Sequence, residues 1–474
     1  MDAFASDRTK RRALVIGGSI AGMCAARILS RHYDEVIIVE RDRYPDSAAH
    51  RPGVPQSRYV HGLLGRGQRE LERLFPGFER TVVDRGALLL DVGHDFAWLH
   101  PWGWSHRAEW GMPTILCSRS LLEWTIRDRV KTTPNLKIIE DARVEELIVE
   151  GGRRRRVTGV RARISGHELQ SIFADLVVDA SGRTRKARSW LERCGIAPPD
   201  EEVVDPLAGY ACRTYRAPPP EKRPPGWWWR GIFIDPVPPH GRRLGVLLPI
   251  EDEQWLVGVV GFNGDYPPTD EAGYLEWLHG LRSPALGEAV RHAEPLSAIH
   301  GSRSTVNSFC HFERWPDRPD HFVALGDSVC TLNPVYGQGM TVAILSALEL
   351  DASLRATGAD GVKMPERFHR RLARFLQLPW SMAVSKDLAW PGTLGKRPIA
   401  TTLMGPYLDA VVEGMFRDVH LARKLLPAAH LLASPVRFFG PSAALGALKS
   451  TARRFPPFQG RVASEPGVPP FGAE

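Results

Sequence analysis

Residues 12–27 read RALVIGGSIAGMCAAR, and residues 35–40, after a short polar stretch, read EVIIVE. The apolar run 13–16 predicts a strand, Gly17 permits a tight turn, and the Ala-rich segment after it predicts a helix. A second strand, 36–39, ends in Glu40. Such a strand, turn and helix direct backbone N–H groups and the positive end of a helix dipole at a pyrophosphate, while the acid can bind a ribose diol. We therefore predict a dinucleotide site.

The strict pattern G-x-G-x-x-G is not met, because Ser19 stands between Gly17 and Gly22. Serine is still small enough for close approach of a phosphate, and Gly22 still allows the helix to pack on the strand. The alternative is a glycine turn in an ordinary α/β unit. The flanking strands and an acid 18 residues after Gly22 favour the dinucleotide site.

The composition argues against several classes of partner and site. A chain of 474 residues predicts two or three structural units. The net charge of +8 is scattered and no nucleic-acid module is visible, so we expect no nucleic-acid partner. The six cysteines lie far apart without a C-x-x-C pair, which argues against a metal site or disulfides. No signal-peptide apolar region precedes the first strand, and no run of about 18 apolar residues could span a membrane, so we expect a cytoplasmic protein.

The rest of the chain differs from region to region in its expected secondary structure. We expect helices over 68–75 and 118–130, a strand over 169–178, and an arginine-rich hairpin tip at 153–156. The tryptophan-rich segment 86–112 is typical of core packing. Residues 200–320 combine proline-rich loops with the antiparallel strands 244–250 and 255–262, which predicts a second domain built on a sheet. The last hundred residues have a helical pattern interrupted by prolines.

Three further segments point to the same ligand. Asp179-Ala-Ser-Gly182-Arg183 follows an apolar strand, and so does Gly326-Asp327. An acid at the carboxyl end of a strand can accept hydrogen bonds from ribityl or ribose hydroxyls. Residues 333–340, NPVYGQGM, lead into a helix whose N-terminal N–H groups can stabilise negative charge on a flavin ring.

Together these motifs resemble the FAD-dependent monooxygenases of the para-hydroxybenzoate hydroxylase fold, over residues 11–360. Residues 333–343 and the upstream VPQSRYVHGLL at 54–64 are most similar to bacterial squalene-epoxidase-like enzymes, which include epoxidases of polyenes in polyether biosynthesis. The resemblance implies an α/β fold, with a Rossmann-type, glutathione-reductase-like FAD-binding domain, an antiparallel-sheet substrate domain and C-terminal helices. It implies FAD-binding segments at 11–85, 113–195 and 316–370, substrate-domain segments at 86–112 and 196–315, and a helical region at 371–474.

The resemblance also implies which residues bind FAD. Arg119 would contact the cofactor from the start of its helix, and Asp327 would hold the ribityl or pyrophosphate region. The other residues implied at the pyrophosphate and adenosine are Gly17, Gly18, Ser19, Ile20, Ala21, Gly22, Glu40 and Arg41. Those implied at the flavin ring are Pro334, Gly337, Gln338, Gly339 and Met340. Arg58 and His61 lie in a loop that varies across the family. Many aromatic hydroxylases carry asparagine where Met340 stands, so an apolar substrate is favoured over a phenol.

In this family a flavin C4a-hydroperoxide delivers one oxygen atom to an alkene or arene, and no catalytic side chain or metal site stands out in the sequence. We expect oxygenation of an apolar polyene or aromatic substrate in natural-product biosynthesis, with electrons from NAD(P)H or a partner flavin reductase. Alternatives on the same fold are a halogenase, a prenyl reductase and a non-enzymatic binder of lipidated proteins. Trp102-Gly103-Trp104 lacks the Ile-Pro of the halogenase signature Trp-x-Trp-x-Ile-Pro.

The C-terminal residues 417–461 carry eight basic side chains and one acid, interleaved with leucines and phenylalanines. This composition is typical either of weak peripheral membrane contact or of a lid that packs on the protein through its apolar face. The prolines at 427, 435 and 441 are expected to cut the stretch into short pieces.

Overall fold

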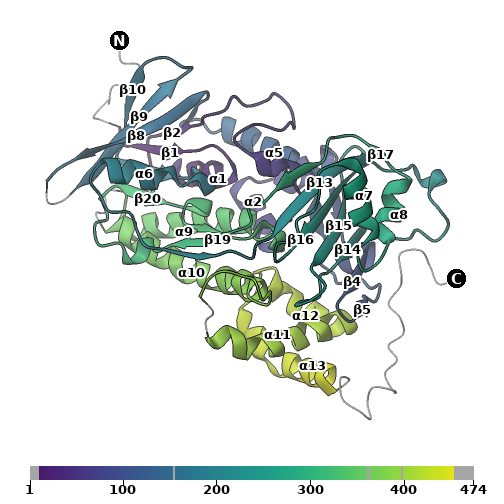
Figure 1. The fold of residues 1–474 in the computed structure, drawn as a ribbon. Coiled ribbons are helices and arrows are strands. Elements are labelled where there is room, and N and C mark those ends of the chain that lie inside the picture. Colours follow the sequence, from purple (N-terminus) through teal and green to yellow (C-terminus); the bar gives the residue numbers. More distant parts are fainter. Residues whose placement is uncertain (1–9, 153–154, 360–362, 397–398, 453–474) are drawn as a thin grey trace.

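The computed structural model describes residues 10–152, 155–359, 363–396 and 399–452. A parallel five-stranded sheet with the order β20-β11-β1-β2-β7 carries the N-terminal motif (Figure 1). The strands of this sheet are β1 (Arg12–Ile16), β2 (Glu35–Val39), β7 (Leu136–Ile139), β11 (Leu176–Asp179) and β20 (Phe322–Ala324). Because all five run in one direction, the loops that follow their carboxyl ends meet at one edge of the sheet, where ligands of open α/β sheets bind.

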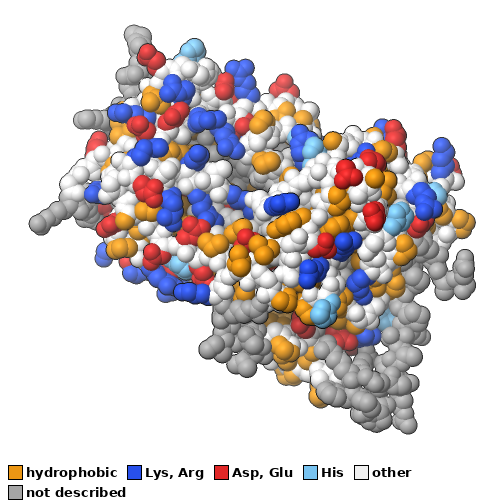
Figure 2. All heavy atoms as spheres, in the orientation of Figure 1, with side chains coloured by type: hydrophobic (Ala, Val, Ile, Leu, Met, Phe, Trp, Pro, Cys, Tyr) orange, Lys and Arg blue, Asp and Glu red, His pale blue; other side chains and the backbone are white. Residues whose placement is uncertain are grey.

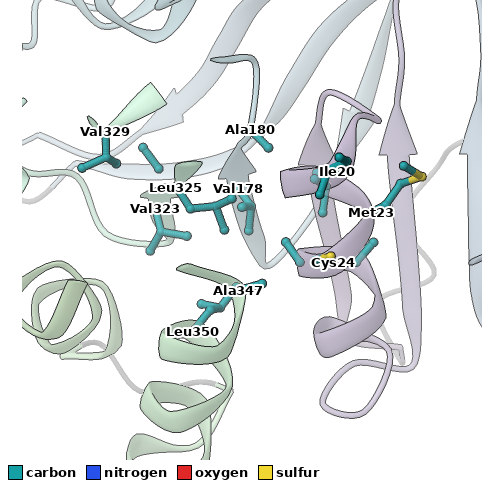
Figure 3. Packing of buried hydrophobic residues seen from close by; sticks show 14 of the residues in the cluster. Ile20, Met23, Cys24, Val178, Ala180, Val323, Leu325, Val329, Ala347 and Leu350 are labelled. Carbon is teal, nitrogen blue, oxygen red and sulfur yellow. The ribbon is translucent and has the colours of Figure 1, made fainter. Parts of the chain in front are cut away.

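Two helices pack side by side against this sheet and bury its apolar residues. They are α1 (Ile20–Leu29) and α9 (Gly339–Thr357). Figure 3 shows Cys24 of α1, Val178 of β11, Leu325 after β20 and Leu350 of α9 directed into one cluster. The helices are almost free of charged side chains where they face the sheet, which is why their burial is favourable.

A second sheet, of eight strands, has the order β17-β13-β16-β15-β14-β4-β5, with β18 also paired to β13. Its strands are β4 (Phe96–His100), β5 (Gly103–Trp104), β13 (Gly209–Arg216), β14 (Gly231–Ile234), β15 (Arg243–Ile250), β16 (Gln254–Gly261), β17 (Glu294–Pro295) and β18 (His300–Ser302). The predicted strands 244–250 and 255–262 are confirmed as the antiparallel pair β15 and β16. One pair, β4 with β14, is parallel, because β4 arrives from an earlier segment of the chain.

Three smaller sheets complete the described part of the fold. They contain β3 (Leu88–Leu90) with β6 (Thr114–Leu116), β8 (Ala142–Glu150) with β9 (Arg156–Ile164) and β10 (Leu169–Phe173), and β12 (Glu201–Val204) with β19 (Asn307–Cys310) and β21 (Cys330–Thr331). The prediction of one strand over 169–178 is wrong. The chain turns after Phe173, so β10 joins an antiparallel sheet while β11 joins the parallel one. The predicted hairpin tip lies between β8 and β9, and Arg153 and Arg154 fall outside the described residues.

The other helices cover the sheets and form the C-terminal region. They are α2 (Gly65–Leu74), α3 (Phe78–Asp84), α4 (Val92–Asp95), α5 (Arg119–Lys131), α6 (Lys186–Arg193), α7 (Glu271–His279), α8 (Ala285–Arg291), α10 (Met364–Asp387), α11 (Ile399–Arg417), α12 (Val419–Ala429) and α13 (Pro441–Ala452). The prediction that prolines interrupt the C-terminal helical pattern is wrong for three prolines. Pro379, Pro406 and Pro427 lie inside α10, α11 and α12, because packing with neighbouring helices stabilises these segments.

The distribution of charged and apolar side chains on the surface is that of a globular protein. On the face drawn in Figure 2, basic and acidic side chains are intermixed over most of the surface. Among the described residues, no helix has the length and apolar content needed to cross a bilayer.

Candidate cofactor and substrate site

The first part of the site is the start of α1. Gly17 has a φ of +97°, and a Cβ there would lie 2.6 Å from the carbonyl oxygen of Ala180, so glycine is needed between β1 and α1. Ser19 is the N-cap residue, yet its side chain does not cap the helix, and the first turn contains no acid. The N-terminus of α1 is therefore electropositive and has no side chain bound across it, as an anion site requires. The predicted residues from Gly17 to Gly22 form this turn and the first helical residues.

Arg119 lies beside this helix start. Its guanidinium donates to Ser19 Oγ at 3.2 Å, and Ser19 Oγ donates in turn to Glu123 Oε2 at 2.8 Å. The Nε of Arg119 is buried and has no hydrogen-bond partner among the described residues. Burial lowers the pKa of Arg119, with the charge of Glu123 opposing that shift. A buried donor without a partner at an electropositive helix end fits a phosphate group.

Glu40 lies at the end of β2 and is held by several donors. Its Oε2 accepts from the backbone N–H of Gly18 at 2.7 Å, and its Oε1 accepts from that of Asp42 at 3.0 Å. Arg51 approaches Glu40 at 3.1 Å. The carboxylate is thus fixed against the glycine turn, where it retains lone pairs for a ribose hydroxyl.

Arg51 is a site residue that the sequence did not indicate. Besides Glu40, it contacts Asp42 and Glu123, each at 2.7 Å. Burial would lower the pKa of Arg51, but Glu123 and Glu40 raise it above its ordinary value, so the guanidinium stays charged. We call these three acids with Arg51 the carboxylate cluster. Arg41, predicted to bind the cofactor, is exposed and donates to the carbonyl of Gly53 at 3.1 Å.

The second and third motifs meet next to α1. Asp179 ends β11 and accepts from the N–H of Ser181 at 2.9 Å, and Gly182 N–H donates to Ser328 Oγ at 2.9 Å. Burial raises the pKa of Asp179. Asp327 lies in the short turn 326–328, 3.4 Å from Arg183 Nε. The turn touches α1, because a Cβ at Gly326 would lie 3.0 Å from Ala21 Cβ. The structure thus brings Asp327 to the N-terminus of α1.

The loop 333–338 leads into α9, and we call it the ring loop. Its predicted residues Pro334, Gly337, Gln338, Gly339 and Met340 surround the N-terminus of α9. Gln338 is the N-cap residue without a capping side chain, and its buried Oε1 has no partner among the described residues. A Cβ at Gly339 would meet no atom within 4 Å. Open space, an unpartnered amide and a free helix N-terminus together fit the electron-rich edge of a flavin ring.

A buried polar network supports the ring loop from α10. Asp387 accepts hydrogen bonds from Asn333 Nδ2 at 3.0 Å, Asn307 Nδ2 at 2.5 Å and Tyr336 OH at 2.5 Å. Burial raises the pKa of Asp387 to about 6, and the hydrogen bonds from Tyr336, Asn307 and Asn333 oppose that rise. Asp387 lies 47 residues beyond the end of the motif at Met340, and no local pattern marked it.

A small cavity lies between the start of α9 and the eight-stranded sheet. Its lining residues are His61, Leu63, Ile115, Leu116, Cys117, Leu122, Leu248, Pro249, Ile250, Leu256 and Met340. Burial and the charge of Arg119 together lower the pKa of His61 to about 4, so the imidazole is neutral at pH 7. The cavity is thus apolar, with a neutral histidine and a buried thiol as its polar groups.

Several residues that the sequence analysis singled out lie outside this cavity. The tryptophans do not line it: Trp98 and Trp110 pack with Phe416, at ring distances of 4.9 and 5.4 Å, between the sheet and the C-terminal helices. Large aromatic rings are used there because they fill the gap between two layers. Arg58 is also not among the lining residues, and its guanidinium lies 3.0 Å from His300 Nε2. Within the described residues, no group of three or more His, Cys, Asp or Glu side chains could hold a metal ion.

Solved structures share this architecture. Flavin-dependent brominase Bmp2 superposes with a TM-score of 0.64 at 14% identity, over 94% of this chain and 99% of its own. p-Nitrophenol 4-monooxygenase PnpA from Pseudomonas putida gives a TM-score of 0.63 at 16% identity, over 90% of this chain and all of its own. At these identities the comparison establishes the fold, which is the fold of flavin-dependent monooxygenases and halogenases.

Sequence comparison gives a nearer relative. No family model matches the chain. Protein Rv3254 from Mycobacterium tuberculosis is 31% identical over 396 residues, which cover 80% of this chain and 81% of the relative. A shared identity of this extent over most of both chains shows common descent, and the chain belongs to the family of protein Rv3254.

Proposed function

We propose that this protein is an FAD-dependent monooxygenase that inserts one oxygen atom from O2 into an apolar, unsaturated substrate. The observation that carries the proposal is the apolar cavity between Met340 at the start of α9 and Leu248, Pro249, Ile250 and Leu256 of β15 and β16. It adjoins the helix end that fits a flavin ring. Bound FAD would activate O2 and supply the oxygen atom, and the protein would supply position and dryness.

The residues have separate tasks in this proposal. Arg119 and the backbone N–H groups at the start of α1 bind the pyrophosphate, Glu40 binds the adenosine ribose, and Asp327 binds the ribityl chain. The N–H groups at the start of α9 stabilise negative charge on the reduced ring. His61 is neutral at pH 7, so it lines the apolar cavity without bringing a charge into it. NAD(P)H or a partner reductase supplies the electrons.

Within this function we propose epoxidation of a polyene in natural-product biosynthesis. Support comes from Met340, an apolar side chain where a phenol hydroxylase would offer an amide, and from the absence of a charged side chain among the described residues that line the cavity. Halogenation is disfavoured, because a flavin halogenase presents a lysine to its substrate and the lining residues include none.

The test uses holoenzyme that is reduced without oxygen, mixed with a polyene and then exposed to 18O2. Mass spectrometry should detect a product that is heavier by one 18O atom. The matched control repeats the reaction in H2 18O under 16O2, where the product should carry no label. Label that arrives from water, or a brominated or chlorinated product when halide is added, would contradict the proposal.

A further inference from the structure

The C-terminal helix α13 is packed with its small residues inward and its large apolar residues outward. Ala443, Gly446 and Ala447 are buried, whereas Leu445 is 53% and Leu448 is 65% exposed. Just before α13, Val436 is 69% and Phe439 is 52% exposed. Figure 1 shows α13 at the outer edge of the C-terminal helices. We call Val436, Phe439, Leu445 and Leu448 the outer apolar face.

The packing explains why the leucines cannot turn inward. A Cβ at Gly446 would lie 2.4 Å from Leu421 Cδ2 of α12, so only a residue without a side chain fits there. Because residues at i, i+3 and i+4 share one helix face, Leu445, Leu448 and Lys449 project together on the other side. Exposed apolar clusters of this kind mark contact sites more often than single exposed leucines do.

The charged residues of the segment that carries the outer apolar face have one sign. Between Val419 and Ala452 the sequence contains four cationic residues, Arg423, Lys424, Arg437 and Lys449, and no acidic residue. Lys424, Arg437 and Lys449 are exposed, and Lys424 Nζ lies 3.5 Å from Ser442 Oγ of α13. Of the acids in the preceding segment, Asp418 caps α12, Glu413 is buried beside Arg417, and Asp409 is an exposed residue of α11. The face is therefore apolar with a basic rim.

We infer that the outer apolar face of η7 (Pro435–Phe439) and α13 docks the protein on an anionic lipid surface. Leucine, valine and phenylalanine side chains enter the boundary between headgroups and acyl chains, and the three cations contact lipid phosphates. A second copy of this chain is a poorer occupant, because it would bring a second set of cations against the first. The tail after Ala452 begins with Arg453 and Arg454, so it continues the basic charge and does not balance it.

The experiment measures co-sedimentation of the full-length holoenzyme with vesicles of phosphatidylglycerol and phosphatidylcholine, or of phosphatidylcholine alone. We expect binding to the anionic vesicles, with at least about tenfold less to the neutral ones and a decline as salt increases. The double variant Leu445→Ser/Leu448→Ser should lower the partition coefficient about tenfold or more, because two apolar side chains no longer enter the lipid. Arg437→Glu/Lys449→Glu should lower it at least about twentyfold.

The matched control is Leu169→Ser/Val203→Ser, which removes two apolar side chains of similar exposure from other parts of the surface. It should bind like the wild type, and all variants should keep their melting temperature, because the altered side chains are exposed. Three outcomes would overturn the inference: no binding by the wild type, equal loss in the control, or a dimer in light scattering that the leucine variant abolishes. Binding that appears only after deletion of residues 453–474 would also overturn it, because the tail would then be the occupant.

Discussion

Two helix N-termini frame the candidate site, and their surroundings are opposite in character. The start of α1 is surrounded by buried charges: Arg119, and the carboxylate cluster around Arg51. The start of α9 faces an apolar cavity and is supported by amide and hydroxyl groups that converge on Asp387. Both helix N-termini offer N–H groups to negative charge, so they differ mainly in the polarity of the groups around them. The charged end suits tight binding of a pyrophosphate and ribose, and the dry end suits chemistry that must exclude water.

The largest effect on stability is expected from removing the cation of the carboxylate cluster at the start of α1. Arg51→Met leaves Glu40, Asp42 and Glu123 buried without their shared cation, so the free energy of unfolding should fall by about 3–5 kcal/mol. Urea denaturation measures it. Arg43→Met removes a cation that pairs with Asp141 at 3.0 Å but is 77% exposed, and should cost less than about 1 kcal/mol. Equal losses in the two variants would mean that the cluster is no more dependent on its cation than a surface pair.

The network that supports the start of α9 should make the free energy of unfolding depend on pH through Asp387. Its pKa in the folded protein is about 6, above the ordinary 3.8, so the folded state binds the proton more tightly. The free energy of unfolding should therefore decrease as pH rises from 3.8 to about 6, by about 3 kcal/mol in total. Asp387→Asn removes this titration, so its stability should vary less with pH over that range. A wild-type slope in Asp387→Asn would contradict the assignment.

A smaller effect tests the apolar character of the cavity. Met340→Asn places an amide among aliphatic side chains, so the KM or Kd for a hydrocarbon substrate should increase about tenfold. Met340→Leu conserves volume and should change it less than about threefold. Bound flavin, measured by absorbance after denaturation, should stay the same in both. If Asn and Leu behave alike, the side chain at 340 does not contact the substrate.

The smallest effect is expected at Ser19. Its side chain does not cap α1, so Ser19→Gly removes only the hydrogen bonds with Glu123 and Arg119. Glycine is also the usual residue at this position of the pattern, and the Kd for FAD should change by less than about threefold. Titration of FAD into apoprotein by fluorescence quenching measures it. A loss of more than about thirtyfold would show that the hydroxyl itself binds the cofactor.

Short segments with strong local requirements were predictable from sequence. The turn at Gly17 needs a residue without a side chain, the strand 36–39 is a continuous apolar run, and the helix after residue 339 follows a loop rich in glycine. These features depend on neighbours within a few residues, so a pattern records them. The error at 169–178 has the same origin. Two apolar runs close together look like one strand unless their partners in different sheets are known.

The sequence by itself determined the fold class, the N-terminal turn and the motifs that meet at the edge of the parallel sheet, because glycine turns, buried strands and helix starts are properties of consecutive residues. The tertiary structure determined which side chains complete the site. Arg51 reaches Glu123 across 72 positions of the chain, and Asp387 reaches Asn333 across 54. Such pairs form because a buried charge or amide must find a partner wherever the packing places one, and nothing in the local pattern of either residue specifies it.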